Sequence, residues 1–114
     1  MAKITNQPDQ IGINIITAGT KITGNLSVSG NMRIDGEIDG ALDINGKLVV
    51  GPHAVILGNV KVQNIEVEGK IVGDITVEDT IQLRSAANIQ GNIITQKIAI
   101  EAGVVFNGNC KMPE

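Results

Sequence analysis

The residues of this sequence that could do chemistry are few and isolated, and the single histidine is the clearest example. His53 lies in the segment Gly51-Pro52-His53-Ala54, whose composition is typical of a turn. An imidazole could act as a general base, but the count excludes a zinc site with three histidine ligands. We therefore expect His53 to lie at a solvated corner without a catalytic role.

Four carboxylates lie close together in the sequence, at Asp35, Glu37, Asp39 and Asp43. Paired carboxylates can carry out acid–base catalysis or bind calcium. These residues alternate with apolar ones, however, and the glycine-rich calcium-repeat motif is absent. We expect the four side chains to face water beside Arg33, with no metal bound.

The remaining candidates also favour a protein without a catalytic site or a cofactor. Cys110 is the only cysteine, so no intrachain disulfide can form, and its position in the last repeat predicts a buried side chain. No P-loop motif for nucleotide phosphates occurs. The net charge of −3 and the single aromatic residue, Phe106, argue against nucleic-acid binding.

A seven-residue pattern recurs six times along the chain and must position any functional residue. It reads aliphatic, any, Gly, any, aliphatic, any, aliphatic, as in Ile22 to Val28, and its last two copies depart from it at Thr95 and Cys110. The pattern's glycines are spaced by 16, 18, 15, 18 and 17 residues, which indicates a repeat protein. These glycines are Gly24, Gly40, Gly58, Gly73, Gly91 and Gly108.

Apolar and polar residues alternate within each repeat, and a period of two predicts short β-strands rather than helices. The chain has 19 Ile, 11 Val and 5 Leu, so most of its aliphatic residues are β-branched, which also favours strands. Three short strands in each repeat can enclose a triangular prism, with every winding paired to the next. We therefore predict an all-β fold, a triangular parallel β-helix of about six windings with three short strands per winding.

This register predicts where each side chain points. One inward column contains Ile22, Ile38, Ile56, Ile71, Ile89 and Phe106. A second inward column contains Leu26, Leu42, Val60, Ile75, Ile93 and Cys110. The residues that follow the glycines predict side chains that hydrogen-bond along the axis, as in stacked amides: Asn25, Ala41, Asn59, Asp74, Asn92 and Asn109. Ser27, Asp43, Lys61, Thr76 and Lys111 are expected to face water, and Ile94 is expected to form an exposed apolar site.

The repeats divide the chain into three parts. We expect a flexible N-terminal arm at residues 1–12, a β-helix polymerisation domain at residues 13–112 and a C-terminal stub at residues 113–114. The arm lacks the apolar segment of a signal peptide, and no apolar run is long enough to span a membrane. These features favour a cytoplasmic protein, and the sequence leaves its association with a membrane open.

The repeat pattern, its spacing of 15–18 residues and the string Met32-Arg-Ile-Asp-Gly36-Glu-Ile-Asp-Gly40 resemble the bactofilins. This family comprises bacterial polymer-forming cytoskeletal proteins, and the similarity covers about residues 13–112. The resemblance implies a right-handed β-helix that stacks end to end into filaments without nucleotide. Some family members also carry a membrane-targeting peptide at the N-terminus, whereas Met1–Gln10 of this chain is not obviously amphipathic.

The ends of such a β-helix predict its function. Terminal windings expose unpaired backbone groups and core side chains unless a helix or a polar repeat caps them, and the sequence shows neither. We therefore expect a structural protein without enzymatic activity, whose partner is another copy of itself and whose filaments act as a scaffold. The residues expected at the C-terminal contact are Val104, Phe106, Cys110 and Met112, and those at the N-terminal contact are Ile13, Ile15 and Ile22.

Two alternatives remain open from the sequence. One is a relative of the left-handed β-helix acyltransferases of the hexapeptide-repeat type, with His53 as the catalytic base. Such an enzyme would also need substrate-binding insertions and a stricter six-residue period. The other is a monomeric β-solenoid that binds a partner through its flat faces.

Overall fold

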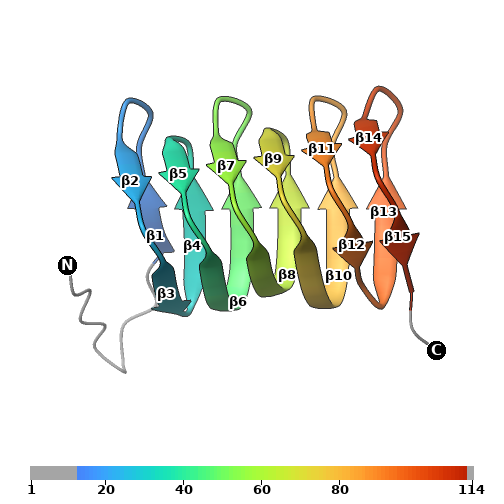
Figure 1. Cartoon of the computed structure of the whole chain (residues 1–114), viewed down its shortest axis with the longest axis horizontal. Helices are drawn as coiled ribbons and strands as arrows, with labels where there is room; N and C mark the ends of the chain where they lie inside the picture. The colour runs from blue at the N-terminus through green and yellow to red at the C-terminus, as the bar shows by residue number, and fades with distance from the viewer. Residues whose placement is uncertain (1–12, 113–114) are drawn as a thin grey trace.

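The protein is a stack of six windings along one axis, as the ribbon in Figure 1 shows. The structure is a computed structural model, and it describes residues 13–112. All regular elements in that range are β-strands, and the predicted arm and stub lie outside it. The strands are β1 (Ile13–Ile16), β2 (Lys21–Thr23), β3 (Leu26–Ser29), β4 (Asn31–Ile34), β5 (Glu37–Asp39), β6 (Leu42–Val50), β7 (Val55–Leu57), β8 (Val60–Val67), β9 (Lys70–Val72), β10 (Ile75–Leu83), β11 (Asn88–Gln90), β12 (Ile93–Ile94), β13 (Lys97–Ile100), β14 (Val105–Asn107) and β15 (Cys110–Lys111).

Each winding contributes to three faces of the rod. The first face contains β1, β4 and β13, together with the second halves of β6, β8 and β10. The third face contains β3, β12 and β15, together with the first halves of β6, β8 and β10. The second face is a separate six-stranded sheet in the order β14-β11-β9-β7-β5-β2. Neighbouring windings pair in parallel throughout, so the prediction of a parallel β-helix with about six windings is confirmed.

One corner differs from the expected break between strands. β6, β8 and β10 run from the third face onto the first face without interruption, and their pairing register shifts by one residue where they bend. A local insertion of this kind bends a strand and leaves the pairing intact on either side of it. The first and third faces therefore belong to one nine-stranded sheet.

The core contains both predicted columns, together with the inward residues of the first face. Ile38, Ile56, Ile71 and Ile89 follow one another in register on the second face and are completely buried. The column of the third face runs in register from Leu26 to Cys110, as predicted. Apolar contacts between successive windings, together with the parallel backbone ladder, thus hold the stack together.

Glycine recurs at one corner because two independent constraints exclude other residues. All six pattern glycines have positive φ, for example +144° at Gly73, a region that L side chains rarely adopt. In addition, a Cβ at Gly73 would collide with the carbonyl group of Gly58 in the winding before it. The five later glycines each stack on the glycine of the preceding winding, and together with the positive φ this explains why glycine occupies the position in every repeat.

The residues after these glycines hydrogen-bond along the axis, as predicted. The donors are backbone N–H groups, however, and not the side-chain amides that a stack of asparagines would use. The Oδ1 atoms of Asn25, Asn59 and Asn92 accept bonds from the backbone N–H groups of Ala41, Asp74 and Asn109, at 3.2, 3.1 and 3.3 Å. A carboxylate can do the same, and Oδ1 of Asp74 accepts from the N–H group of Asn92 at 3.2 Å. Since each side chain needs only an acceptor oxygen, Asp replaces Asn in this column.

The corner between the first and second faces has two lengths, which explains why the glycine spacing is 15 or 16 residues in some repeats and 17 or 18 in others. Four residues form it at 17–20, 51–54, 84–87 and 101–104, and two residues form it at 35–36 and 68–69. The longer corners are the raised loops at the upper edge of Figure 1. The two-residue corners end in glycine because a Cβ at Gly36 or Gly69 would collide with backbone carbonyl groups of the longer corner in the preceding winding.

Candidate polymer interfaces

The two ends of the rod differ from the windings between them. Within the described residues, the terminal strands β1, β2 and β3 pair with a neighbour on one side only, and so do β13, β14 and β15. Their outer backbone groups and the last members of the core columns are therefore uncovered. An open strand edge above an apolar core favours association with another chain.

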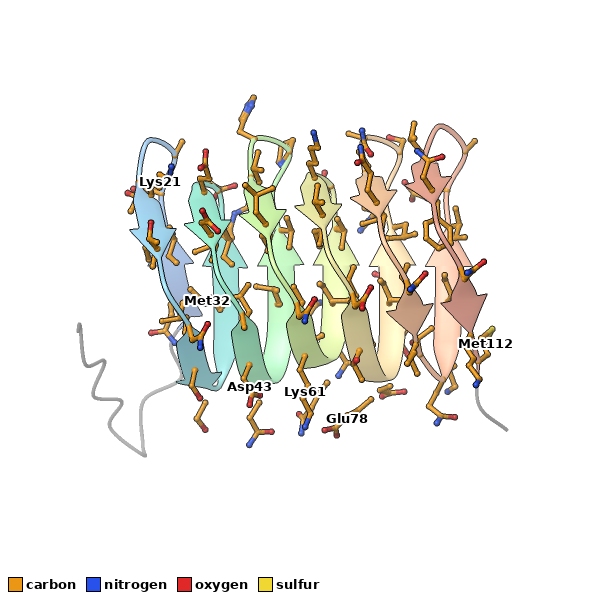
Figure 2. The ribbon with its side chains drawn as sticks, viewed as in Figure 1. Lys21, Met32, Asp43, Lys61, Glu78 and Met112 are labelled. Carbon is orange, nitrogen blue, oxygen red and sulfur yellow. The ribbon has the colours of Figure 1, made fainter. Side chains whose placement is uncertain are left out.

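The C-terminal end exposes a group of apolar side chains that continue the core columns. Ile100 is 52% exposed and Met112 is 49% exposed, whereas Leu83, which pairs with Ile100 in the preceding winding, is completely buried. Phe106 extends the isoleucine column from Ile89 and is half-buried against the core. In Figure 2, Met112 lies at the outer end of the last winding.

All four residues predicted for this end lie in the last winding, and one of them overturns a separate prediction. Phe106, Val104 and Met112 belong to the last winding, and the first two pack against the core. The prediction that Cys110 is buried is wrong, because its thiol-bearing side chain is exposed. Cys110 does continue the inward column from Ile93, but no further winding covers it. Ile100 was not among the predicted residues, although its place in the alternating pattern was the available signal.

The N-terminal end has a less apolar composition. Ile22 begins the isoleucine column and is half-buried, as Phe106 is at the other end. Ile15 is 60% exposed and pairs with Arg33 on the outward side of the first face. The inward positions of β1 are instead Asn14 and Ile16, which pair with Met32 and Ile34.

Ile13 is the remaining residue predicted for the N-terminal contact. Its backbone pairs with Asn31, but its side chain lies outside the described residues.

Two carboxylates of the predicted acidic cluster form ion pairs with basic side chains. Asp35 accepts a hydrogen bond from Nε of Arg33 at 2.9 Å, and this bond raises the pKa of the guanidinium. Glu37 lies 3.4 Å from Nζ of Lys21. Within residues 13–112 no group of three or more His, Cys, Asp and Glu residues could hold a metal ion. Two members of the acidic cluster, Asp35 and Glu37, therefore form ordinary ion pairs at the surface, and Asp39 and Asp43 are exposed to water.

Arg84 joins three successive windings at the corner of the first face. Its guanidinium lies 3.2 Å from Glu66 and 3.4 Å from Glu101, and the hydrogen bond to Glu66 raises its pKa. Oε1 of Glu101 also accepts the backbone N–H of Ser85 at 3.1 Å. These contacts link windings through side chains, in addition to the backbone ladder.

The sides show no arrangement of an enzyme's catalytic groups in the described part of the chain. His53 is exposed at the corner 51–54, as expected. A groove of about 640 Å³ follows the third face, with Leu42, Val60 and Ile75 among its lining residues. Asp43 and Lys61 line its rim and point to water, as Figure 2 shows. This part of the chain also contains no helix that could cross a lipid bilayer.

Comparison with known proteins identifies the fold and the family together. The chain matches a family model described as bactofilin, polymer-forming cytoskeletal, over residues 14–111. Curated protein sequences give no significant match.

Three solved structures are similar over most of the chain. A cryo-EM reconstruction of double helical filaments of Thermus thermophilus bactofilin has a TM-score of 0.84 at 27% identity, covering 88% of this chain and 99% of that one. The solid-state NMR structure of the cytoskeletal bactofilin BacA has a TM-score of 0.81 at 27% identity, covering 92% and 99%. A crystal structure of a Thermus thermophilus bactofilin mutant has the same fold, with a TM-score of 0.75 at 24% identity, covering 79% and 100%.

The family model spans almost the whole β-helix, from the first strand to the last, and the solved relatives share its architecture. The chain therefore belongs to the bactofilin family of polymer-forming cytoskeletal proteins.

Proposed function

We propose that this bactofilin forms its filaments through contacts between terminal windings, with the β-helix axes aligned along the filament. Polymer formation and a structural rather than enzymatic role follow from the family. The route of assembly is the proposal. Its main support is the C-terminal winding, where Ile100, Phe106 and Met112 leave the core incompletely covered.

Two interactions favour an end-to-end contact between subunits: backbone hydrogen bonds and the burial of apolar side chains. The outer edges of the terminal strands can form backbone hydrogen bonds with a second copy, as they do within the rod. The same contact removes apolar side chains from water, which stabilises it by about 25 cal/mol for each Å² buried. Because the core columns run the whole length of the rod, a second copy extends them.

The proposal needs no ligand. Its partner is another copy of the chain, and its location is the cytoplasm, where the family's cytoskeletal role and the single cysteine both fit. The acyltransferase and the monomeric binding module are not favoured, since the family forms polymers.

Phe106→Arg tests the C-terminal contact. A guanidinium in the last winding can turn toward water in the free rod, but it would be buried without a counter-ion in a stacked end. We expect the variant to fold and its critical concentration for assembly to rise at least about 100-fold, which corresponds to roughly 3 kcal/mol. Circular dichroism checks the fold, and sedimentation with electron microscopy checks assembly.

A matched control places the same charge on an outward face of the rod, where the side chain does not belong to a core column. Ile94 is 44% exposed on the third face, so Ile94→Arg should leave filaments unchanged. Ile100→Arg provides a second test at an exposed position of the last winding, should Phe106→Arg fail to fold. Normal filaments from both end variants would place the contact elsewhere.

A further inference from the structure

The outer edge of β2, at the N-terminal end of the second face, is open within residues 13–112. In each later winding, the first residue of the second-face strand donates its backbone N–H to the carbonyl oxygen of the residue that precedes the strand one winding earlier. These bonds run from Glu37 to Thr20, Val55 to Gly36, Lys70 to Ala54, Asn88 to Gly69 and Val105 to Ala87, at 2.8, 3.1, 3.0, 2.9 and 3.0 Å. Lys21 holds the same position in β2, at the outer end of the first winding (Figure 2), and no described winding precedes it.

The chain before β1 repeats the sequence of this open strand. The tripeptide Lys-Ile-Thr occurs twice in the chain, at residues 3–5 and, as β2, at residues 21–23. Seven residues separate each copy from the next strand of the first face, residues 6–12 before β1 and residues 24–30 before β4. Both connections end in glycine, at Gly12 and Gly30.

The register of β1 fixes where a second strand with this sequence would lie. Ile13 pairs with Asn31, 18 residues later, and the second tripeptide also begins 18 residues after the first. A connection of equal length that follows the path of β3 therefore brings each residue of the first tripeptide beside its counterpart in β2. The carbonyl group of Ala2 then accepts the backbone N–H of Lys21, which completes the series of bonds between windings.

The side chains at this edge suit such a strand. Ile4 extends the isoleucine column and covers Ile22, which is half-buried in the described residues. Lys3 lies beside Lys21, whose Nζ atom is 3.4 Å from Glu37. Both ammonium groups face water, so their repulsion costs little.

The rest of the segment has the composition of a capping repeat. At the same offset, Pro8 and Gln10 correspond to Leu26 and Val28, which belong to the inward column and the core of the third face. Proline lacks a backbone donor and glutamine is polar, so a further winding gains little by stacking on this one. Asn6 takes the place of the pattern glycine, which is why the glycine pattern does not reveal this copy.

We propose that residues 2–12 form a partial winding over the N-terminal end of the rod, with residues 3–5 as a strand parallel to β2. The occupant of the open edge is this segment of the same chain, and a second copy must displace it to bind there. The inference rests on the proposed function and adds its regulation. It replaces the flexible arm and the uncapped N-terminal end that were expected from the sequence.

The partial winding makes assembly depend on an opening step. Only the fraction of subunits whose N-terminal edge is free can accept another copy, so the apparent affinity of that end is reduced by this fraction. The segment is tethered to β1 and competes at a high effective concentration. It therefore raises the critical concentration for assembly.

Paired cysteines test the register of docking. Thr5→Cys/Thr23→Cys, in a Cys110→Ser background, places two thiols on parallel strands about 4.8 Å apart, within the range of a disulfide. In Thr5→Cys/Lys21→Cys the two positions are out of register and more than about 7 Å apart. With oxidised glutathione and dilute, unassembled subunits, the first pair should form its intramolecular disulfide at least about tenfold faster than the second.

The same disulfide tests competition with assembly. The oxidised Thr5→Cys/Thr23→Cys protein should have a critical concentration at least about tenfold above that of its reduced form, and reduction should restore assembly. Ile4→Asp should act in the opposite direction and lower the critical concentration at least about threefold, because a carboxylate is not readily buried over Ile22. Thr5→Asp is the matched control, since it adds the same charge at an outward position and should leave assembly unchanged.

Three outcomes would overturn the proposal: similar rates of disulfide formation in both cysteine pairs, normal assembly of the oxidised protein, or an unchanged critical concentration for Ile4→Asp. Failure of the proposed function has a different signature, which is normal filaments from both Phe106→Arg and Ile100→Arg. The two failures are distinguishable because the disulfide rates are measured on unassembled subunits and do not depend on the route of assembly.

Discussion

Ile71 shows how strongly a single side chain depends on the stacking of windings. It lies in register between Ile56 and Ile89, and all three are completely buried. An aspartate at this position would place a carboxylate in an apolar column without a hydrogen-bond donor. Burial of an uncompensated charge costs several kcal/mol, so Ile71→Asp should lower the melting temperature sharply or prevent folding, as circular dichroism would show.

Ile94→Asp is the control for this prediction, because the side chain at that position already faces water. Its melting temperature should stay close to that of the unmodified protein. An Ile71→Asp protein that melts normally and assembles would contradict the register of the whole second face.

Thr95 and Cys110 show that the repeat pattern alone does not predict which side chains are buried. Thr95 stands where an aliphatic residue was expected, and it is completely buried. Its hydroxyl donates a hydrogen bond to the carbonyl oxygen of Lys97 at 2.8 Å, so the polar group is satisfied at a bend of the chain. Cys110 follows the pattern and yet is exposed, because burial in a stack requires a winding on both sides.

At the glycine corner, a comparison of Gly73 with Gly24 separates the two reasons for glycine, which are the positive φ and the close contact with the preceding winding. Both have positive φ, +144° and +118°, but a Cβ at Gly24 would meet no atom within 4 Å, whereas one at Gly73 would collide with Gly58. Gly24→Ala should therefore lose only about 1–3 kcal/mol of stability from backbone strain. Gly73→Ala should lose more, because the backbone of two windings must also move apart.

Urea denaturation of both variants measures this difference. We expect the midpoint of Gly73→Ala to lie clearly below that of Gly24→Ala. Equal midpoints would mean that backbone strain alone selects glycine in this column and that the contact between windings yields readily.

The strands could be predicted from the sequence because a period of two and the glycine positions together fix the phase of each winding. The columns from Ile22 to Phe106 and from Leu26 to Cys110 follow from that phase alone. The start of the chain could not be assigned in the same way. Ile13 and Ile15 occupy one phase of β1 and Ile16 the other, and the four-residue corner at 17–20 separates them from the first glycine.

The bends and corners also lay beyond the pattern. Nothing in the alternation of apolar residues distinguishes a corner of two residues from one of four, since both return the chain to the same phase. Only the stacked backbone shows that Gly36 and Gly69 lie under carbonyl groups of a longer corner. The sequence predicts that the terminal windings expose apolar residues. It does not predict which side chains are exposed, because the repeat pattern is the same in a terminal winding as in a covered one.

At the scale of the whole molecule, the driving force for filaments should lie in the polypeptide itself. The proposed end contact uses apolar burial and backbone pairing, and neither requires a nucleotide or a metal ion. Purified protein should therefore assemble in plain buffer that contains a chelator. Filaments that appear only after addition of ATP, GTP or a divalent cation would contradict this account of assembly.

Salt should leave the proposed end contact intact. Raising the salt from about 0.1 M to about 1 M shortens the Debye length from about 10 Å to about 3 Å, which weakens attraction between exposed charges. The proposed end contact is mainly apolar, because Ile100, Phe106 and Met112 leave the core of the last winding incompletely covered. Filament mass in a high-speed pellet should therefore stay constant over this range. A fall in filament mass as the salt rises would mean that charge, rather than the apolar end of the last winding, holds the subunits together.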